Sequence, residues 1–278
     1  MVTTDTNASL QPFSTLAAFL AGIRIVMVNT TLPANIGSAA RAMHTMGLTQ
    51  LTVVAPKLPI DEDAYAHAAG AKAILDTVTI CDTLEQALQD CHWVIATSSR
   101  QRHIPRPVLS PRQAAELMVT NFHSLGDLMT DSAHRNWQLA IVFGREDRGL
   151  TNEELQLADY HIQIPANPQY GVLNVAAAVQ VIASVFYETA ELALTAKTAA
   201  EKSIDLTFRQ QWDEPPISNE QRLQLENRLL ALLENLDIYN PAQSKVMPQR
   251  INRLLSRLQL DIKEYQLLQA TIAKLLKR

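Results

Sequence analysis

Six short apolar runs, separated by segments of helical character, restrict the fold of this 278-residue chain more than any other feature. They are rich in β-branched residues and lie at 23–28, 51–55, 77–80, 93–97, 139–143 and 160–164. Because the runs are apolar throughout rather than alternating, they are typical of parallel strands that are covered on both faces. The sequence therefore predicts an α/β fold with a doubly wound parallel sheet over residues 22–190.

Local signals place helices between the expected strands. Asn35 is expected to cap a helix that Gly47 ends. Thr151 and Glu154 have the spacing of a capping box. A long apolar helix is expected over 174–190, on the carboxyl side of the last strand.

Four segments make up the expected domain organisation. An N-terminal extension (1–21) precedes the α/β domain (22–190), and a linker (191–218) leads to a small all-α C-terminal domain (219–278), in which leucines and isoleucines recur at helical spacing. Residues 245–278 hold eight basic and two acidic residues, a net charge of +6 in a chain whose total is −4. This basic tail indicates either an anionic partner or only a solvated helix face.

Composition excludes several classes of protein. Apolar residues make up 47% of the chain and charged residues 19%, which is enough to bury a sizeable core. No run approaches the roughly 20 apolar residues that span a bilayer, and residues 1–11 lack the basic start of a secretory signal. The only cysteines, Cys81 and Cys91, cannot form a disulfide framework. We therefore expect a reduced, cytoplasmic protein that does not bind membranes.

Common enzyme motifs of α/β folds are also missing from the sequence. No glycine-rich dinucleotide fingerprint or P-loop follows a strand, and no G-x-S-x-G element is present. The seven histidines lack ligand spacing, so no metal site is expected. These observations argue against dehydrogenases, nucleotide hydrolases and serine hydrolases of common type.

Three polar loops remain, each at the carboxyl end of an expected strand, where open α/β sheets bind ligands. The first (29–47) holds Asn35 and Arg41 at the start of a helix, which suits an anion, although a simple cap and a solvent-facing arginine would give the same pattern. The second (97–112) is rich in arginine and free of acids, which suits a phosphate backbone or only a solvated loop. The third pairs Glu146 with Asn174, 28 residues later, which meet if their strands are neighbours.

Taken together, these loops resemble a known family. N-x-G-x-x-x-R at 35–41, FGRE-x-x-GLTNEEL and IPANPxYxxLNVAxAVQV are similar to the three motifs of the SPOUT-class (TrmH family) RNA 2′-O-methyltransferases. The sequences VNTTLPANIGSAARAMHTMGL and TSSRQR, together with the C-terminal segment from Met247, are most similar to its branch of tRNA (cytidine/uridine-2′-O-)-methyltransferases.

That resemblance implies a fold and a function. The fold would be a SPOUT parallel-sheet domain whose C-terminal part forms a trefoil knot, although knots are very rare in proteins. The chain would be a homodimer that uses S-adenosylmethionine to methylate the ribose of cytidine or uridine at nucleotide 32 of tRNA, with no DNA substrate. A 2′-O-methyltransferase of ribosomal RNA or another tRNA position, and a catalytically silent RNA-binding protein, are the alternatives.

The resemblance also implies roles for individual residues, in three sets. Residues around the reacting ribose would be Asn35, Arg41, Glu146 and Asn174. Those of the cofactor pocket would be Thr97, Ser98, Gly144, Glu146, Ile164, Pro165 and Leu173. Those that bind RNA would be Arg100, Arg102, Arg106 and Arg145.

Two points of chemistry qualify this set. The branch usually has two serines where this chain has Gly171 and Val172, so two hydroxyl groups are missing, although backbone N–H groups can serve at a glycine. Arg41 is often regarded as the base, but a guanidinium stays protonated in proteins. We expect Arg41 to hold the adjacent phosphate and stabilise the forming alkoxide, while the proton leaves through the phosphate, Glu146 or water.

Overall fold

A seven-stranded parallel sheet forms the centre of the computed structural model, which describes residues 15–98, 106–128, 137–195 and 214–277. Every pairing between neighbouring strands is parallel. The strands are β1 (Ile23–Val28), β2 (Gln50–Val54), β3 (Thr79–Cys81), β4 (Trp93–Thr97), β5 (Val108–Leu109), β6 (Leu139–Phe143) and β7 (Tyr160–Ile162). Their order in the sheet is β3-β2-β1-β6-β4-β7-β5.

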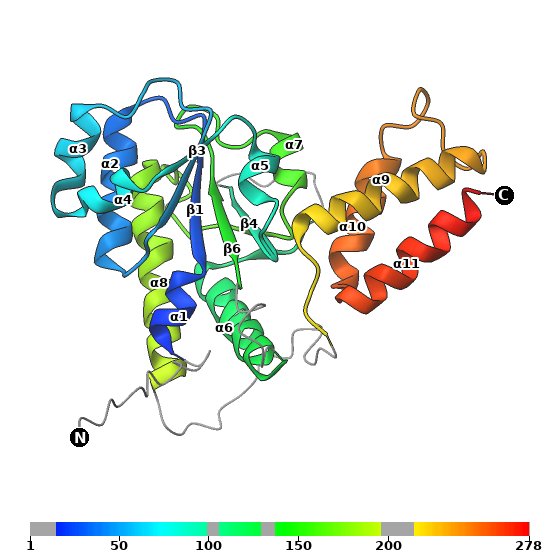
Figure 1. Ribbon diagram of the computed structural model, residues 1–278. Coiled ribbons are helices and arrows are strands. Elements are labelled where there is room, and N and C mark those ends of the chain that lie inside the picture. The colour runs from blue at the N-terminus through cyan, green and yellow to red at the C-terminus, as the bar shows by residue number, and fades with distance from the viewer. Residues whose placement is uncertain (1–14, 99–105, 129–136, 196–213, 278) are drawn as a thin grey trace, which may run out of the picture.

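Helices cover both faces of the sheet (Figure 1). Those of the sheet-containing part are α1 (Leu16–Ala21), α2 (Pro33–Thr45), α3 (Glu62–Ala68), α4 (Lys72–Asp76), α5 (Leu84–Leu88), α6 (Pro111–Leu128), α7 (Asn152–Gln156) and α8 (Val175–Thr195), with a 3₁₀ turn, η1 (Ala69–Ala71), between α3 and α4. The expected α/β parallel-sheet fold is confirmed. The threading of the chain into a knot stays a prediction.

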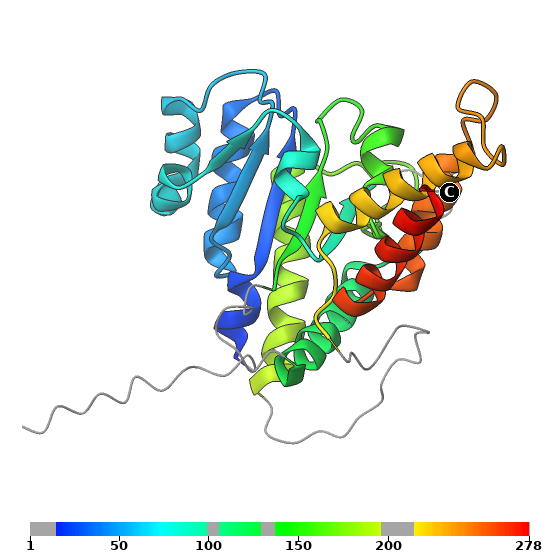
Figure 2. The ribbon, with the colours of Figure 1, turned by 45° about the vertical axis from the view of Figure 1, so that its right-hand side comes forward.

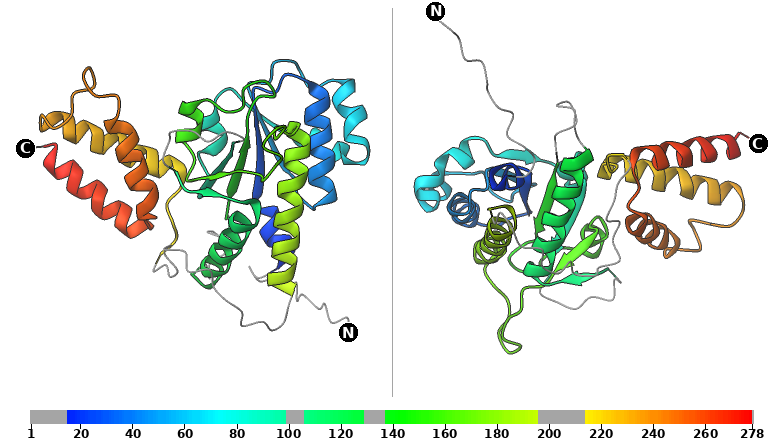
Figure 3. Two further views of the ribbon diagram at one scale, coloured as in Figure 1. Left: turned by 180° about the vertical axis from the view of Figure 1, so that it is seen from behind. Right: turned by 90° about the horizontal axis from the view of Figure 1, so that it is seen from below.

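Residue alternation along β1 sends side chains into two separate cores, because successive side chains point to opposite faces of a strand. Ile25 and Met27 are buried with α1, α2, α6 and α8, which Figure 3 (left) shows together on one face. Val26 and Val28 are buried on the other face, with the apolar residues of α5 and with Leu155 of α7. Both faces of the central strands are therefore inaccessible to water, as the unbroken apolar runs predict.

Helix α8 is the one helix among the described residues that is long and apolar enough to cross a membrane by length and composition, over Val175–Leu194. It packs against α1, α2 and α6. Val179, Ile182 and Phe186 are fully buried in the larger core. One face of α8 therefore lies inside the fold, while Val181 and Leu192 on the same helix are exposed.

Three further helices form a unit beside the sheet, and Figure 2 shows them packed on one another. They are α9 (Asn219–Asn235), α10 (Met247–Leu258) and α11 (Ile262–Leu275). Leu225, Leu232, Leu255 and Ile272 form a small core of their own between these helices. The helices occur where the leucine spacing predicts them, while the domain boundaries at 21, 190 and 218 stay predictions.

Polar contacts attach this helical unit to the sheet. The guanidinium of Arg222 on α9 lies 3.0 Å from the carboxylate of Asp159, just before β7, and both side chains are largely buried. The Asn219 N–H donates to the Cys91 carbonyl, and the Glu220 N–H donates to the Gln89 carbonyl. We call the pair of Arg222 and Asp159 the docking ion pair.

The start of α2 differs from the sequence-based expectation. The helix begins at Pro33, with Leu32 as the N-cap residue, so Asn35 lies in its first turn and is not the cap. Proline is well suited to the first helical position, because its fixed φ matches the helix and its missing N–H costs nothing there. The side chain of Asn35 is consequently free to make contacts outside the helix.

Candidate active site

Three polar segments meet at the carboxyl edge of the sheet. Met27 at the end of β1 pairs in register with Phe143 at the end of β6, and Thr97 at the end of β4 pairs with Ile162 on β7. Since β6 also pairs with β4, the loops that follow these strands emerge side by side. The sheet order therefore brings Asn35, Glu146 and Asn174 together from three distant parts of the sequence.

A continuous chain of hydrogen bonds joins these three residues. The Asn174 side-chain amide donates to Asn35 Oδ1 at 3.0 Å, and the Asn35 amide donates to Glu146 Oε1 at 2.8 Å. Glu146 also accepts the backbone N–H of Thr31, at 3.1 and 3.2 Å to its two oxygens. Asn174 in turn caps α8, because its Oδ1 accepts the N–H of Ala176 at 2.9 Å. Each side chain is therefore held by groups on more than one element.

The environment of Glu146 favours its ionised form. Burial alone would raise its pKa, but hydrogen bonds from Asn35, from its own backbone and from the N–H groups of Thr31 and Leu32 outweigh burial and lower it. The carboxylate also lies at the N-terminus of α2, where a negative charge is favourable. A carboxylate that accepts several N–H groups and has a lowered pKa is a weak base, so its geometry suits an anchor for Asn35 better than a proton acceptor.

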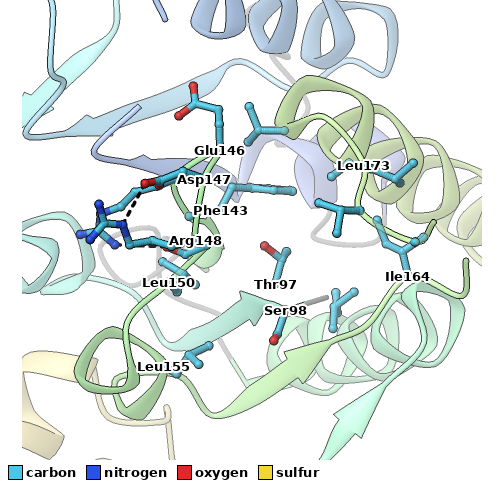
Figure 4. Close-up of a pocket in the computed structure, with 18 residues that line it drawn as sticks. Thr97, Ser98, Phe143, Glu146, Asp147, Arg148, Leu150, Leu155, Ile164 and Leu173 are labelled. Atoms are coloured by element: carbon cyan, nitrogen blue, oxygen red, sulfur yellow. Dashed lines mark hydrogen bonds and ion pairs between the residues drawn. The ribbon is translucent and has the colours of Figure 1, made fainter. Parts of the chain in front are cut away.

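A pocket opens beside this chain, between the loop 144–150 and the segment 171–178 (Figure 4). Six of the seven residues predicted for the cofactor line it: Thr97, Ser98, Gly144, Glu146, Ile164 and Leu173. Pro165 is exposed and is not among the lining residues. Phe143, Leu150 and Leu155 add an apolar wall, and Figure 4 shows Ile164 and Leu173 on the opposite side. An apolar slot with polar groups at its edge suits a nucleoside.

The loop 144–150 is tightly folded. Arg145 and Gly149 form an antiparallel bridge, with the Gly149 N–H donating to the Arg145 carbonyl at 2.9 Å. Gly144 is required because a Cβ there would lie 2.3 Å from backbone atoms of Gly149 and Leu150, closer than any real contact. Gly149 itself has a φ of 71°, which favours glycine. The backbone therefore fixes where Glu146 leaves the loop.

Arg41 lies apart from the other three predicted ribose-site residues. It is exposed on α2, and within the described part of the chain its side chain makes no hydrogen bond or ion pair with Asn35, Glu146 or Asn174. A separation of six residues along a helix corresponds to about 9 Å of rise and about 120° of rotation. A single copy of the chain thus leaves the Arg41 guanidinium accessible to a ligand or to another molecule.

The four arginines predicted to bind RNA have different environments. Arg100 and Arg102 lie outside the described residues. Arg106 is buried, and its guanidinium donates to the Gln156 carbonyl and to Ser256, each at 2.8 Å, and to Asn252. Burial lowers the pKa of Arg106 to about 10, so it remains charged at neutral pH. Its contacts lie within the protein, at the base of the helical unit, and leave it unavailable to RNA.

Arg145 is also engaged within the protein. It makes two contacts with the Glu154 carboxylate, at 2.7 and 2.9 Å, and it donates to the Asn29 side chain. Sequence reasoning missed both partners. The Thr151–Glu154 capping box could have indicated Glu154, whereas no sequence pattern singles out Asn29, which follows β1 with a positive φ of 49°.

Within the described residues, no group of three or more His, Cys, Asp or Glu side chains could hold a metal ion. The arrangement therefore consists of a pocket with apolar and polar lining residues and an amide–carboxylate chain at its edge.

Comparison with known proteins decides the family. The model of the SpoU rRNA Methylase family matches residues 22–184, which contain all three motifs and the pocket. The chain belongs to the SpoU methylase family. The resemblance drawn from the motifs to SPOUT 2′-O-methyltransferases is thereby confirmed.

The match between this chain and its relatives spans different shares of the relatives' length. A protein of Klebsiella pneumoniae named tRNA (cytidine/uridine-2′-O-)-methyltransferase TrmJ is 37% identical over 92% of this chain and 97% of its own. One of Pseudomonas aeruginosa, named tRNA (cytidine/uridine/adenosine-2′-O-)-methyltransferase TrmJ, is 49% identical, but the match spans only 58% of each chain. The crystal structure of TrmJ from Z. mobilis covers 92% of this chain and 99% of that one, with a TM-score of 0.71 and 28% identity.

Proposed function

We propose that this chain transfers the methyl group of S-adenosylmethionine to the ribose 2′-hydroxyl of cytidine or uridine at nucleotide 32 of tRNA. The observation that carries the proposal is the Asn174–Asn35–Glu146 hydrogen-bond chain at the edge of a partly apolar pocket. The names of the relatives support the tRNA substrate, because the Klebsiella protein matches over nearly its whole length.

The residues of the pocket fit the proposed cofactor. Phe143, Leu150 and Leu155 offer an apolar surface to an adenine ring, and the hydroxyl of Ser98 lines the same pocket. The Thr97 hydroxyl donates to the Val142 carbonyl at 3.0 Å, which fixes the side chain at the pocket floor. When bound, S-adenosylmethionine supplies an activated methyl group on a positively charged sulfur, so the reaction needs no metal.

The protein's own groups would act mainly by positioning, which can supply much of a rate acceleration. Asn35 and Asn174 hold the edge of the site against the ionised Glu146. Because the lowered pKa of Glu146 makes it a weak base, we assign the departing proton to the RNA phosphate or to water. Arg41 would hold that phosphate and stabilise the forming alkoxide, and Arg41→Lys would lose much of the rate because a lysine lacks the bidentate fork.

In a single copy the Arg41 side chain makes no hydrogen bond or ion pair with the described Asn35, Glu146 or Asn174, which leaves room for a second copy to complete the site. Large apolar side chains are exposed beside the pocket, among them Leu32, Tyr170, Val172 and Leu173, with exposed fractions of 41–87%. Exposed apolar surface of this kind marks an interaction site. We therefore include the predicted homodimer, with the site near the interface, in the proposal.

Binding of the tRNA body is assigned to the helical unit. Lys245, Arg250 and Arg257 are exposed on or before α10, and Lys274 and Lys277 are exposed at the end of α11. Phosphate contacts of this kind position RNA without specifying its sequence, while the unstacked bases of an anticodon loop can be read directly. A cytoplasmic location accords with a tRNA substrate and is part of the proposal.

Methyl transfer to tRNA tests the proposal directly. Purified protein and labelled S-adenosylmethionine are incubated with total tRNA from a strain that lacks the gene, and the modified nucleotide is mapped. We expect a 2′-O-methylated pyrimidine at nucleotide 32, and no transfer to a transcript with 2′-deoxyribose at that nucleotide. The name of the Pseudomonas relative includes adenosine, so transcripts with each base at nucleotide 32 define the range.

Each other outcome has a definite meaning. Transfer to a different tRNA nucleotide, or only to ribosomal RNA, would keep the chemistry and overturn the assigned position. Cofactor binding without transfer to any RNA would favour a catalytically silent RNA-binding protein.

A further inference from the structure

Arg145, Glu154 and Asn29 form a compact polar cluster on the far side of the loop that carries Glu146. The two guanidinium nitrogens of Arg145 face the two carboxylate oxygens of Glu154 at 2.7 and 2.9 Å, which is the bidentate geometry of a strong ion pair. Both side chains are only about one-sixth exposed, at 15% and 16%. Such a pair is shielded from salt far better than a surface pair.

Three structural elements are joined by this cluster. Glu154 belongs to α7 and also accepts the Thr151 N–H at 2.7 Å, which closes the capping box of that helix. Asn29 follows β1, accepts from Arg145 and donates to the Ala55 carbonyl after β2 at 2.9 Å. Arg145 further donates to the Gly149 carbonyl at 3.2 Å, across its own loop. The loop 144–150 is thus attached to β1, β2 and α7 through one guanidinium.

Glu146 is the next residue along the chain from Arg145. Its carboxylate has to meet the Thr31 N–H and the Asn35 amide at hydrogen-bond distance. The backbone of the same loop also lines the cofactor pocket at Gly144, Arg145 and Gly149. Any movement of this loop would consequently displace both the Glu146 anchor and one wall of the pocket.

We propose that Arg145 is a positioning residue, which acts with Glu154 and Asn29 as a clamp that fixes the loop 144–150, and that it does not bind RNA. The inference rests on the proposed function. It assigns to the protein interior an arginine for which the family resemblance implies contact with RNA. Glu154 then has a role in the reaction although it touches neither substrate nor cofactor.

Paired substitutions separate a clamp from an RNA contact. Arg145→Met keeps the apolar stem and removes the fork, Arg145→Lys keeps the charge without the fork, and Glu154→Gln keeps the shape without the charge. We expect all three to lower kcat by about 10- to 100-fold, because small displacements of reacting groups have effects of that size. The double variant Arg145→Met/Glu154→Gln should lose no more than the worse single variant, since both remove one interaction.

In contrast to kcat, RNA binding should not change in the clamp variants. For all clamp variants we expect the KM for tRNA and its dependence on salt to match the wild type within about twofold. If Arg145 contacts a phosphate, Arg145→Met will raise this KM and reduce the salt slope by about one unit. In that case Arg145→Lys and Glu154→Gln will behave like the wild type, and the inference is wrong. The control for loss of one exposed cation is Lys72→Met. Lys72 lies on α4, which precedes β3, a terminal strand of the sheet.

Calorimetry with S-adenosylmethionine alone gives a readout that does not depend on RNA. A loosened pocket wall should raise the dissociation constant in Arg145→Met and Glu154→Gln by about tenfold, while Lys72→Met leaves it unchanged. Thermal melting of every variant separates loss of the clamp from loss of the fold. If the wild type methylates no tRNA, the proposed function fails and this measurement still decides the inference. An unchanged dissociation constant in both clamp variants would overturn it.

Discussion

At the scale of single residues, the site depends on how each polar group is satisfied. Glu146 shows this most clearly, because its carboxylate accepts N–H groups from Thr31, Leu32 and Asn35. Glutamine has the same shape as glutamate, but its amide nitrogen donates hydrogen bonds. In this position that nitrogen would face the N–H groups that now donate to Glu146. The role of Glu146 as an ionised anchor is therefore open to a direct test.

Glu146→Gln should destabilise the protein at neutral pH by about 0.5–1.5 kcal/mol, because the amide nitrogen of glutamine replaces one of the two oxygens that accept from Thr31, Leu32 and Asn35. The pKa of Glu146 is lowered in the folded state, so its contribution is complete above the ordinary glutamate value of about 4.3. It is lost as the pH falls through the lowered value, because the carboxylate then becomes protonated in both states. Urea denaturation of both proteins from pH 7 to pH 3 measures this, and a difference that stays constant over the range would contradict it.

Gly171 provides a second prediction at this scale. Where the family branch usually has two serines, a Cβ on Gly171 would lie 2.9 Å from the Asn167 carbonyl oxygen. Val172 is 63% exposed and has no such restriction. We expect Gly171→Ser to lower the free energy of unfolding by about 1 kcal/mol and to weaken cofactor binding, while Val172→Ser changes stability by less than about 0.5 kcal/mol. Urea denaturation and calorimetry of the two variants check this, and equal stabilities would show that the loop accommodates a serine.

At the scale of helices and strands, two capping boxes offer a matched comparison. Thr83 caps α5 and Thr151 caps α7, and each box has both of its hydrogen bonds. Loss of either threonine should cost about 1 kcal/mol of stability. Only the α7 box also holds Glu154, the partner of Arg145. Thr151→Ala is thus expected to lower kcat as well, whereas Thr83→Ala keeps the wild-type value, as denaturation and methyl-transfer assays on the two variants will show.

Local patterns predicted most of these elements for a physical reason. Strands such as β1, β4 and β6 are buried on both faces, so their apolar runs stand out in the sequence. Strand β5 was missed because it has only two residues, which pair with β7 alone. Helices α3, α4 and α6 were not predicted either. The Asn35 cap was wrong because a proline two residues earlier starts the helix.

Part of the candidate site could be predicted from the motifs, but the hydrogen bonds that connect its residues could not. Motif resemblance supplied Asn35, Glu146 and Asn174, and the structure adds which atom bonds to which. Arg106 illustrates the limit, because its partners Asn252 and Ser256 lie 146 and 150 residues away. A basic residue in a basic loop indicates phosphate binding, and only the tertiary packing reveals that its charge is buried.

At the scale of the whole molecule, the helical unit is held to the sheet by buried polar groups rather than by apolar surface alone. Arg106, which precedes β5, donates to Ser256 on α10, and Arg222 on α9 donates to the Leu157 carbonyl after α7 at 3.1 Å. Asp159 lies opposite Arg222 and also accepts the Val94 N–H at 2.9 Å. Breaking a buried ion pair by removing one partner is costly, because it leaves the other charge without compensation. This arrangement fixes the orientation of the basic helices relative to the pocket.

The docking ion pair therefore yields a prediction about substrate binding. Asp159→Asn leaves the Arg222 charge buried and unpaired, and should weaken docking by about 3 kcal/mol or more. Adding Arg222→Met removes that charge, so the double variant should dock more tightly than Asp159→Asn alone. Hydrogen exchange at the Asn219 and Glu220 amides reports docking, since both bond across the junction.

If the docked orientation presents the basic helices to tRNA, Asp159→Asn should raise the KM for tRNA while the dissociation constant for S-adenosylmethionine, measured by calorimetry, stays at the wild-type value. The double variant should recover part of the lost RNA affinity in step with its slower amide exchange. Fast exchange combined with an unchanged KM would instead mean that the helical unit binds tRNA without a fixed orientation, as a tethered basic module whose attachment to the sheet serves stability alone.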